Sequence, residues 1–523
     1  MSLFKIFKES GLHHDHQYVP GLNELNGKFA KVGSCVKGGF YYTNAKYILD
    51  FISYGTILRL VEIPPNAQIR KAGVKWRSDK IILQTEYSLF DISTFEMLIK
   101  LGANISSKCI TFAATHGKLD LLIFFIKLRS KKKDYFTAFE SAAEHGQLNI
   151  IHHIIDHIDI KVDSYCFAIH EAIVNGHIKI VQYLLELSGV NELKSTFLYG
   201  DMPFMLCAQN NRLDILEYLI KKYPDYICYP TIIINATKYG HLSMVEHYKQ
   251  HIIPNNDYAK IAAIHGHKSL VKFFVKLSGD IPNIIESLDE IIKQKDSSIA
   301  MYLLKKSHHI DNKIIVNSIS SAIEFGHINI LEFMLIKYEV NILEFINDES
   351  IKIAAGNNHL DMIKYLIVSG YKPTIPTLDA SLKCAVASGH THVTQYLIEL
   401  GARVWSMKLT ITMLKPFSNG NLDLTKILVE NNLCMSDICY ILYEACEYDH
   451  IDIIQYLIPK LELEYCVVDE CFGKGVISGN LDIVKIFVNM GNITKDYMKD
   501  AIDAATKYGH TDIVEFLTAI INK

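Results

Sequence analysis

Apolar residues recur at helical spacing along most of this chain. In the stretch 168–189 such a stripe predicts the buried face of a helix, and it consists of Ile180, Val181, Leu184 and Leu185. Another helix comes before this one in the chain and is predicted to end near Asn175. The next residue, Gly176, suits a left-handed turn between the two helices. Because a helix pair this short cannot bury its own apolar face, we expect similar pairs on both sides.

The chain contains further copies of this helix pair at steps of 26 to 35 residues. A period near 30 predicts a solenoid of about 14 repeats, in which each repeat packs on its neighbours. Lys295 does not favour the left-handed conformation, so its repeat is expected to be degenerate. We call the residues aligned with Gly176 the turn positions: Gly117, Gly146, Gly176, Asn211, Gly240, Gly266, Lys295, Gly326, Asn358, Gly389, Gly420, Asp449, Gly479 and Gly509.

Four short motifs resemble ankyrin repeats: His170–Ala172 (HEA), Met202–Cys207 (MPFMLC), Leu101–Asn104 (LGAN) and Leu400–Arg403 (LGAR). The resemblance covers roughly Ser88–Asn522 and implies a mostly α fold of stacked helix pairs. The period is shorter than the usual ~33 residues. We therefore expect many β-hairpin fingers of the family to be clipped or replaced by plain loops.

A narrower resemblance connects the chain to the large ankyrin-repeat families of mimivirus-type giant DNA viruses. Gly509–Leu517 (GHTDIVEFL) is similar to their repeats, and Tyr41–Pro64, Lys75–Leu83 and Tyr87–Asp91 are similar to their N-terminal segment. This resemblance implies a host protein as the target.

Residues 1–86 do not follow the repeat and are interpreted as a small α+β domain, with the ankyrin-repeat solenoid over 87–523. A helix is predicted from a cap at Thr43 through Ser53, closed by Gly55. Strands are predicted at Ile57–Ile63 and Val74–Leu83. We expect this domain to cover the open end of the stack. The widest step predicts an insertion at 191–202.

Composition excludes few classes of protein. The chain has 523 residues and a formal net charge of −4, which does not indicate nucleic-acid binding. No window approaches 18 uninterrupted apolar residues, and no secretory signal is recognised. The eleven cysteines lack any CxxC pair and are expected to be reduced, as in the host cytoplasm. Lys127–Lys133 (KLRSKKK) is a nuclear import signal, an anion-binding patch or a solvated loop between repeats.

Histidine follows the turn position eight times: His177, His241, His267, His327, His359, His390, His450 and His510. A shared metal is excluded because stacked helices lie roughly 8–10 Å apart, whereas zinc needs nitrogen atoms at about 2.1 Å. We expect each ring to hydrogen-bond the backbone of the neighbouring repeat. An aromatic residue seven positions after most turn positions is likewise interpreted as packing between repeats.

Three other clusters could in principle hold a metal, but none has convincing ligand spacing, so no metal or cofactor is predicted. They are His152, His153, Asp156 and His157; His13, His14 and His16; and Cys434, Cys439, Cys446, Cys466 and Cys471. Gly473–Gly479 (GKGVISG) is unlike a true phosphate loop and falls on a predicted inner helix. Without a GxSxG or HExxH motif, we predict no catalytic residues and a protein that is not an enzyme.

The residue before each turn is exposed in the predicted repeat, and the resemblance implies that it borders the concave groove of an ankyrin stack. Aromatic residues there suit protein recognition, although they could instead cover neighbouring repeats. The candidate partner-binding residues are Tyr239, His265, Phe325, Tyr448 and Tyr508.

We expect a monomeric protein-interaction scaffold that binds a host protein through its concave face, away from any membrane. Two alternatives stay open. Residues 1–86 could recruit a ubiquitin ligase, which would make the chain a substrate adaptor. The chain could also be a structural component of a virion.

Overall fold

The structure is a computed structural model that describes residues 2–13, 16–27, 29–30, 37–129, 131–158, 160, 162–187, 202–253, 257–278, 282–294, 296–307, 310–460, 468–491 and 493–522. It divides into two compact units, Met1–Pro254 and Asn255–Lys523. Each unit is described by itself. The insertion predicted at 191–202 lies outside the described residues except for Met202, which begins a helix.

The first unit starts with a seven-stranded sheet in the order β4-β9-β6-β1-β5-β8-β7, and every pairing in it is antiparallel. A separate two-stranded sheet pairs β2 with β3. The strands are β1 (Leu3–Phe7), β2 (Leu12–His13), β3 (His16–Gln17), β4 (Gly21–Glu24), β5 (Phe40–Asn44), β6 (Ile57–Glu62), β7 (Ile69–Ala72), β8 (Lys75–Ser78) and β9 (Lys80–Ser88).

Strand β1 lies in the middle of this sheet, between β6 and β5. Four of its five residues are buried, so neither of its faces is open to solvent. The core beside it comprises Phe7, Phe40, Tyr42, Val61, Ile81 and Leu83. Side chains alternate between the faces of a strand, so Lys5 shares a face with Phe7 and lies against this core.

The predicted helix in residues 43–53 needs correction. Thr43 belongs to β5, and its hydroxyl donates to the carbonyl of Val74 at 2.6 Å instead of capping a helix. The helix begins after Asn44 as α1 (Ala45–Ile48) and continues as the 3-10 helix η1 (Leu49–Tyr54). Gly55 is extended, with φ 170°, so it is no left-handed cap. A Cβ atom there would overlap the carbonyl of Phe7, and this close approach requires glycine.

Strand prediction succeeded only for the second part of this domain. The predicted strand Ile57–Ile63 corresponds to β6, whereas the predicted Val74–Leu83 is two strands, β8 and β9, separated at Asp79. Strands β1, β4, β5 and β7 were not predicted. The apolar runs of these strands are short and do not alternate clearly between apolar and polar residues. In β1 the alternation is missing because both faces of the strand are covered.

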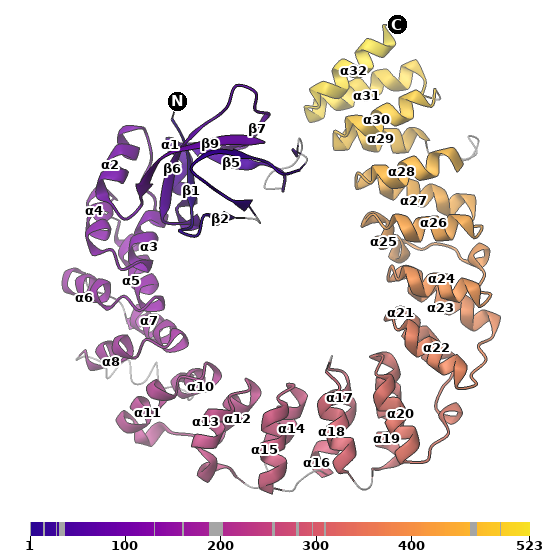
Figure 1. Cartoon of the computed structure of the whole chain (residues 1–523), viewed down its shortest axis with the longest axis horizontal. Coiled ribbons are helices and arrows are strands. Elements are labelled where there is room, and N and C mark those ends of the chain that lie inside the picture. The colour runs from indigo at the N-terminus through magenta and orange to yellow at the C-terminus, as the bar shows by residue number, and fades with distance from the viewer. Residues whose placement is uncertain are drawn as a thin grey trace. The chain divides into compact units, whose positions relative to one another are not determined.

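The remaining helices of the first unit begin directly after the sheet (Figure 1). They are α2 (Ile92–Lys100), α3 (Ser107–Thr115), α4 (Leu119–Arg129), α5 (Lys132–Glu144), α6 (Leu148–His157), α7 (Val162–Asn175), α8 (Ile178–Glu186), α10 (Met202–Gln209), α11 (Leu213–Lys222), η2 (Pro224–Tyr226), α12 (Tyr229–Lys238), α13 (Leu242–His247) and η3 (Lys249–His251). Helix η1 packs against α3, the first inner helix, and Lys108 donates to the carbonyl of Asp50 at 2.8 Å. The N-terminal domain therefore contacts the first inner helix of the stack through η1.

The second unit consists of helices and loops in its described residues. The helices are α14 (Tyr258–Ile264), α15 (Lys268–Ser278), α16 (Pro282–Ile285), α17 (Leu288–Ile292), α18 (Ser298–Lys306), α19 (Asn312–Glu324), α20 (Ile328–Lys337), η4 (Ile342–Glu344), α21 (Asp348–Gly356), α22 (Leu360–Val368), α23 (Ile375–Ala387), α24 (Thr391–Glu399), η5 (Val404–Ser406), η6 (Ile411–Met413), α25 (Lys415–Ser418), α26 (Leu422–Glu430), α27 (Met435–Glu447), α28 (Ile451–Leu457), η7 (Ile458–Lys460), α29 (Val468–Ser478), α30 (Leu481–Asn489), α31 (Lys495–Tyr508) and α32 (Thr511–Ile521).

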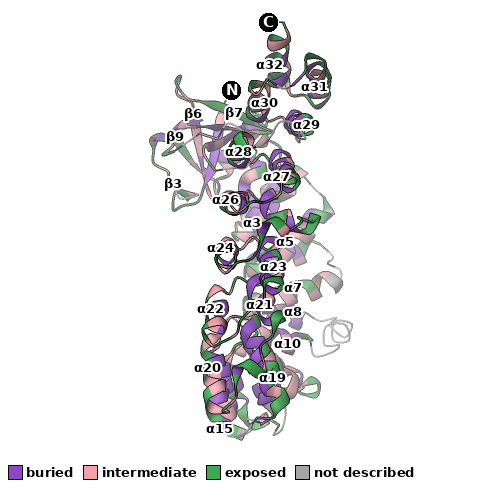
Figure 2. Ribbon diagram, turned by 90° about the vertical axis from the view of Figure 1, so that its right-hand side faces the viewer, coloured by how far each residue is buried: buried purple, intermediate pink, exposed green. Residues whose placement is uncertain are grey.

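Helices stack in two parallel rows within each unit. Inner helices contact the next inner helix, as in α3, α5 and α7 or in α27, α29 and α31, and outer helices do the same in α22 to α32. Buried and exposed residues alternate along these helices (Figure 2). Gly473–Gly479 includes the end of the inner helix α29, which confirms that this stretch is no phosphate loop.

The turn positions behave as predicted wherever they are described. Backbone φ lies between 54° and 85° at Gly117, Gly146, Gly176, Asn211, Gly240, Gly266, Gly326, Asn358, Gly389, Gly420, Asp449, Gly479 and Gly509. Lys295 lies outside the described residues, so the count of 14 repeats stays a prediction. After Ser88 the described residues contain no strand, which agrees with the expected replacement of β-hairpin fingers by loops in that part of the chain.

Candidate protein-interaction surface

The histidines after the turns are used inside the stack. For seven of them the ring Nε2 lies 2.6–3.0 Å from a carbonyl near the end of the preceding inner helix. Because a carbonyl can only accept, each Nε2 carries a proton and donates it. The pairs are His177–Glu144, His241–Gln209, His327–Gln294, His359–Glu324, His390–Gly356, His450–Ser418 and His510–Ile477. This confirms the predicted backbone contact between repeats.

Other donors replace histidine at the same position. The Gln147 amide donates to the carbonyl of Thr115 at 3.0 Å, and the Arg212 guanidinium donates to that of Val174 at 2.7 Å. The side chain of the next repeat also lies directly over the turn glycine. A Cβ on Gly420 would approach Nδ1 of His450 to 2.7 Å. Glycine is therefore favoured at this position for two reasons: the backbone is left-handed, and the neighbouring ring leaves no room for a Cβ atom.

A second set of contacts joins the outer helices. The residue six positions after one turn lies against the residue seven positions after the next turn, and we call this set the outer ladder. Its members include His152 with Tyr183, Glu217 with His247, Lys272 with Tyr302, Lys364 with Tyr396, Lys426 with Tyr456, and Lys485 with Phe516. The predicted packing between repeats is thus confirmed for five members of the aromatic row: Tyr183, Tyr302, Tyr396, Tyr456 and Phe516.

The residues before the turns differ from these two sets, because several stay exposed. The exposed fractions of Tyr239, Tyr448 and Tyr508 are 48%, 54% and 52%. Phe325 is partly exposed at the same position. Tyr239, Phe325 and Tyr448 directly follow their inner helices, and Tyr508 is the last residue of its own, so each of the four is held at the end of an inner helix.

His265 is exposed but engaged by its own helix. Its Nδ1 lies 2.9 Å from the carbonyl of Ile261, four residues earlier. His116, His145, Asn175 and Asn210 bond to the corresponding carbonyls of their helices. These polar side chains therefore satisfy carbonyls at a helix end, which leaves the aromatic residues as the recognition candidates at this position.

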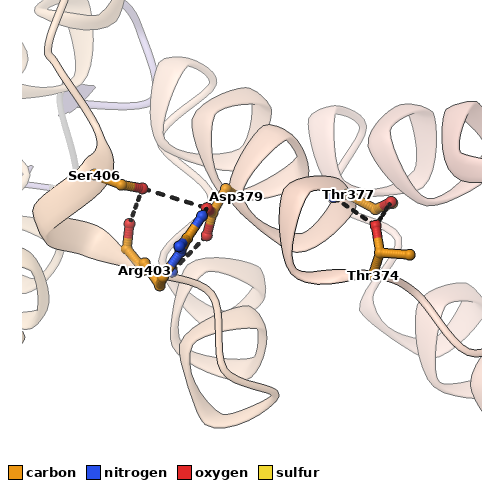
Figure 3. Close-up of polar contacts among 5 residues, drawn as sticks. All are labelled: Thr374, Thr377, Asp379, Arg403 and Ser406. Carbon is orange, nitrogen blue, oxygen red and sulfur yellow. Dashed lines mark hydrogen bonds and ion pairs between the residues drawn. The ribbon is translucent and has the colours of Figure 1, made fainter.

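Sequence reasoning missed an exposed apolar loop between α24 and α25. The exposed fractions of Trp405 and Ile411 in this loop are 61% and 88%. One carboxylate anchors the loop (Figure 3): Asp379 accepts from the backbone N of Arg403 at 2.7 Å and from its Nη2 at 2.6 Å. Ser406 adds a hydrogen bond to Asp379 at 3.3 Å. The LGAR motif at residues 400–403 was the available signal.

The charge of Arg403 and the hydrogen bonds to Asp379 together stabilise the ionised form of this carboxylate. Burial acts to raise the pKa of Asp379, but the hydrogen bonds and the charge of Arg403 lower it overall. In the same helix, Thr374 caps α23 through the backbone N of Thr377 and also bonds the Thr377 hydroxyl (Figure 3). The loop that carries Trp405 is therefore held on a firmly capped helix.

The metal candidates do not form a site in the part of the chain that the structure describes. No group of three or more His, Cys, Asp or Glu residues in that part is placed to hold a metal. The ring of His152 packs against that of Tyr183, and the rings of His153 and His157 pack together. Burial, followed by the effect of His157, lowers the pKa of His153. His14 and Cys466 of the sequence-based clusters lie outside the described residues.

The basic stretch Lys127–Lys133 joins the end of α4 to the start of α5. Its Arg129 is used structurally, because Nε lies 2.7 Å from the buried carboxylate of Asp134. Lys127, Lys131 and Lys133 are exposed. No helix in the described residues is long and apolar enough to cross a membrane.

Comparison with known proteins agrees with this architecture. A sequence model of ankyrin repeats, three copies long, matches residues 142–229. One ankyrin-repeat protein of Acanthamoeba polyphaga mimivirus is 39% identical over 124 residues, which are 21% of this chain and 40% of that protein. Another is 25% identical over 358 residues, 65% of this chain and 52% of that protein. The chain thus spans about half or less of these two relatives.

A further mimivirus protein, which is uncharacterized, is 30% identical over 128 residues that make up 93% of its length and 23% of this chain. Among solved structures, a pentatricopeptide repeat protein from maize covers 82% of this chain and 72% of its own at 11% identity. Its TM-score is only 0.25, so this likeness carries no argument.

Paired helices, left-handed turns and contacts between successive pairs define a helical repeat protein. More narrowly, residues 142–229 match ankyrin repeats, and the chain is similar to ankyrin-repeat proteins of mimivirus.

Proposed function

We propose that the chain is a monomeric, non-enzymatic scaffold that binds a host protein through the row of aromatic residues before the turns. The family is one of protein-interaction modules, which supports the general class of function. The observation that carries the proposal is the contrast between sets of recurring side chains. The turn histidines and the outer ladder are consumed by contacts between repeats, whereas Tyr239, Tyr448 and Tyr508 are about half exposed.

Aromatic residues on rigid helix ends are well suited to this role. A tyrosine has few rotatable bonds, so its ordering costs little, and truncation of a true anchor typically costs about 2 kcal/mol or more. Tyr448 and Tyr508 lie in the second unit at the same place in their repeats. Because the relatives belong to a virus of Acanthamoeba, the proposed target is a protein of the amoebal cytoplasm, with entry into the nucleus through Lys127–Lys133 as an extension.

The test compares the full chain with the triple variant Tyr239→Ala, Tyr448→Ala, Tyr508→Ala. Both proteins are used to capture binding partners from amoebal extract, and the captured proteins are quantified by mass spectrometry. We expect at least one protein to be captured by the natural chain and lost from the triple variant. Circular dichroism and thermal melting should be unchanged, because these side chains are not part of the core.

Tyr440→Ala is the matched control. Tyr440 is also exposed and lies on α27, the helix that precedes Tyr448, but it is not before the turn. Its substitution should leave capture intact. If the triple variant captures the same proteins as the natural chain, the row is not the binding site. Recovery of ubiquitin-ligase subunits would instead favour the adaptor function, and recovery of virion proteins the structural one.

A further inference from the structure

The sheet domain contains a cavity of about 460 Å³, which falls in the size range of small-molecule sites. Much of its wall is aromatic and comes from separate elements: Tyr18 before β4, Phe40 and Tyr41 of β5, and Phe51 of η1. Planar walls of this kind favour a flat, apolar ligand body. The cavity belongs to residues 1–86 and is separate from the aromatic row of the repeats.

Lys5 contributes a buried cation to this cavity. Only 7% of the residue is exposed, although lysine is rarely buried without a partner. Its Nζ donates to the carbonyl of Tyr41 at 3.0 Å and lies 4.9 Å from the centre of the Tyr18 ring. Burial, together with the nearby charge of Lys75, lowers the pKa of Lys5 to about 7. The charge of Lys75 therefore disfavours the charged form of the Lys5 amine.

The other charged side chains among the described lining residues are also lysines, Lys37 and Lys75. Lys75 lies 4.6 Å from the centre of the Tyr41 ring, and His13, His16 and Lys37 also line the wall. None of the described lining residues is Asp or Glu. An anion placed beside Lys5 and Lys75 would stabilise both charged amines and would accept charge-assisted hydrogen bonds from them.

We propose that this cavity binds a small aromatic anion, a planar ring that carries a phosphate or a carboxylate. The ring packs against Tyr18, Phe40 and Phe51, and the anionic group lies between the amines of Lys5 and Lys75. The apolar wall and the paired cations each recognise one half of such a ligand, so neither a neutral ring nor a bare anion has the full set of contacts.

The test uses isothermal titration calorimetry on the full chain at pH 6.5 with four probes. Phenyl phosphate and benzoate carry both halves of the ligand, phenol carries only the ring, and inorganic phosphate carries only the charge. We expect phenyl phosphate or benzoate to bind at least tenfold more tightly than phenol and inorganic phosphate. Whichever of the two binds better identifies the anionic group.

Three substitutions assign the binding to the cavity. Lys5→Met and Lys75→Met should each weaken the better probe at least tenfold, whereas Lys8→Met, at an exposed lysine just after β1, should leave its affinity unchanged. If Lys5→Met disturbs the sheet, as judged by Trp76 fluorescence, the half-buried Lys75 carries the test alone. The proposal is overturned if neither aromatic anion binds, if phenol binds equally well, or if Lys75→Met binds like the natural chain.

Discussion

The sheet of residues 3–88 and the helix pairs after it differ in how often the same kind of contact recurs along the chain. In the sheet, β1 pairs with β5 on one side and with β6 on the other, and neither pairing occurs a second time. In the helix pairs, the bond from His450 to Ser418 has counterparts in six other repeats. Damage to one strand should therefore spread through the sheet, whereas damage to one repeat should stay near it.

The largest expected effect is that of Gly55→Ala in the sheet domain. The new Cβ would overlap the carbonyl of Phe7, which also accepts from the backbone N of Thr56 at 3.0 Å. The central strand must move, so we expect a loss of about 3 kcal/mol in the free energy of unfolding of the sheet. The chain has two tryptophans, Trp76 in β8 and Trp405 in the second unit. Urea unfolding followed by Trp76 fluorescence in a Trp405→Phe background isolates the sheet.

Gly73→Ala is the control for this experiment. Gly73 has φ 63°, but a Cβ there meets no atom within 4 Å. Only the backbone strain remains, which should cost about 1 kcal/mol. Equal losses for Gly55→Ala and Gly73→Ala would contradict the role assigned to the contact with Phe7.

The corresponding change in the repeats is Gly420→Ala, which should cost about 2 kcal/mol. It combines the strain of a left-handed residue with a contact at 2.7 Å to the ring of His450. Hydrogen exchange should rise in residues 411–460 and stay unchanged in residues 310–340. An equal rise across both segments would show that damage spreads beyond the neighbouring repeats.

Gly509→Ala separates the two causes in that prediction. Gly509 has nearly the same φ, 79°, but a Cβ there meets no atom within 4 Å. Its substitution should cost only about 1 kcal/mol. A cost as large as that of Gly420→Ala would mean that the neighbouring histidine ring contributes nothing.

The same difference explains what could be predicted from the sequence. The turn position occurs in every repeat, so a single doubtful residue such as Asn211 or Asp449 did not obscure the pattern. Each strand of the sheet occurs once, and in β1 the buried Lys5 interrupts the apolar run. The positions of Tyr448 and Tyr508 followed from the repeat, whereas the exposure of Trp405 depends on the single anchor between Arg403 and Asp379.

Lys5 also predicts a pH dependence that is specific to the sheet. Its pKa is about 7 in the folded chain and 10.5 in the unfolded reference, so the unfolded chain binds more protons between these values. The free energy of unfolding of the sheet should therefore rise with pH above 7, by at most about 1.4 kcal/mol per pH unit. Burial raises the pKa of Tyr42 to about 12, a contribution that is lost only as pH rises past 10, so measurements should stop at pH 9.5.

Urea unfolding of the sheet between pH 7 and 9.5, followed by Trp76 fluorescence, checks this slope. In Lys5→Met the slope should largely disappear, because the group that releases the proton on folding is gone. The Lys8→Met variant should keep it, since Lys8 is exposed. A slope that persists in Lys5→Met would assign the proton release to other groups.

The smallest expected effect concerns the outer ladder, where each contact is weak and is repeated. The Nζ of Lys364 lies 5.4 Å from the centre of the Tyr396 ring on the next outer helix. A double-mutant cycle with Lys364→Met and Tyr396→Leu should give a coupling of about 0.5 kcal/mol, which is typical of an exposed cation–π pair. The same cycle with Lys364→Met and Tyr456→Leu should give no coupling, because Tyr456 pairs with Lys426 on its own neighbouring repeat. A coupling between Lys364 and Tyr456 as large as that between Lys364 and Tyr396 would mean that distant outer helices respond together. The effect of a substitution would then not stay near its own repeat, and the outer helices would not differ from the sheet in this respect.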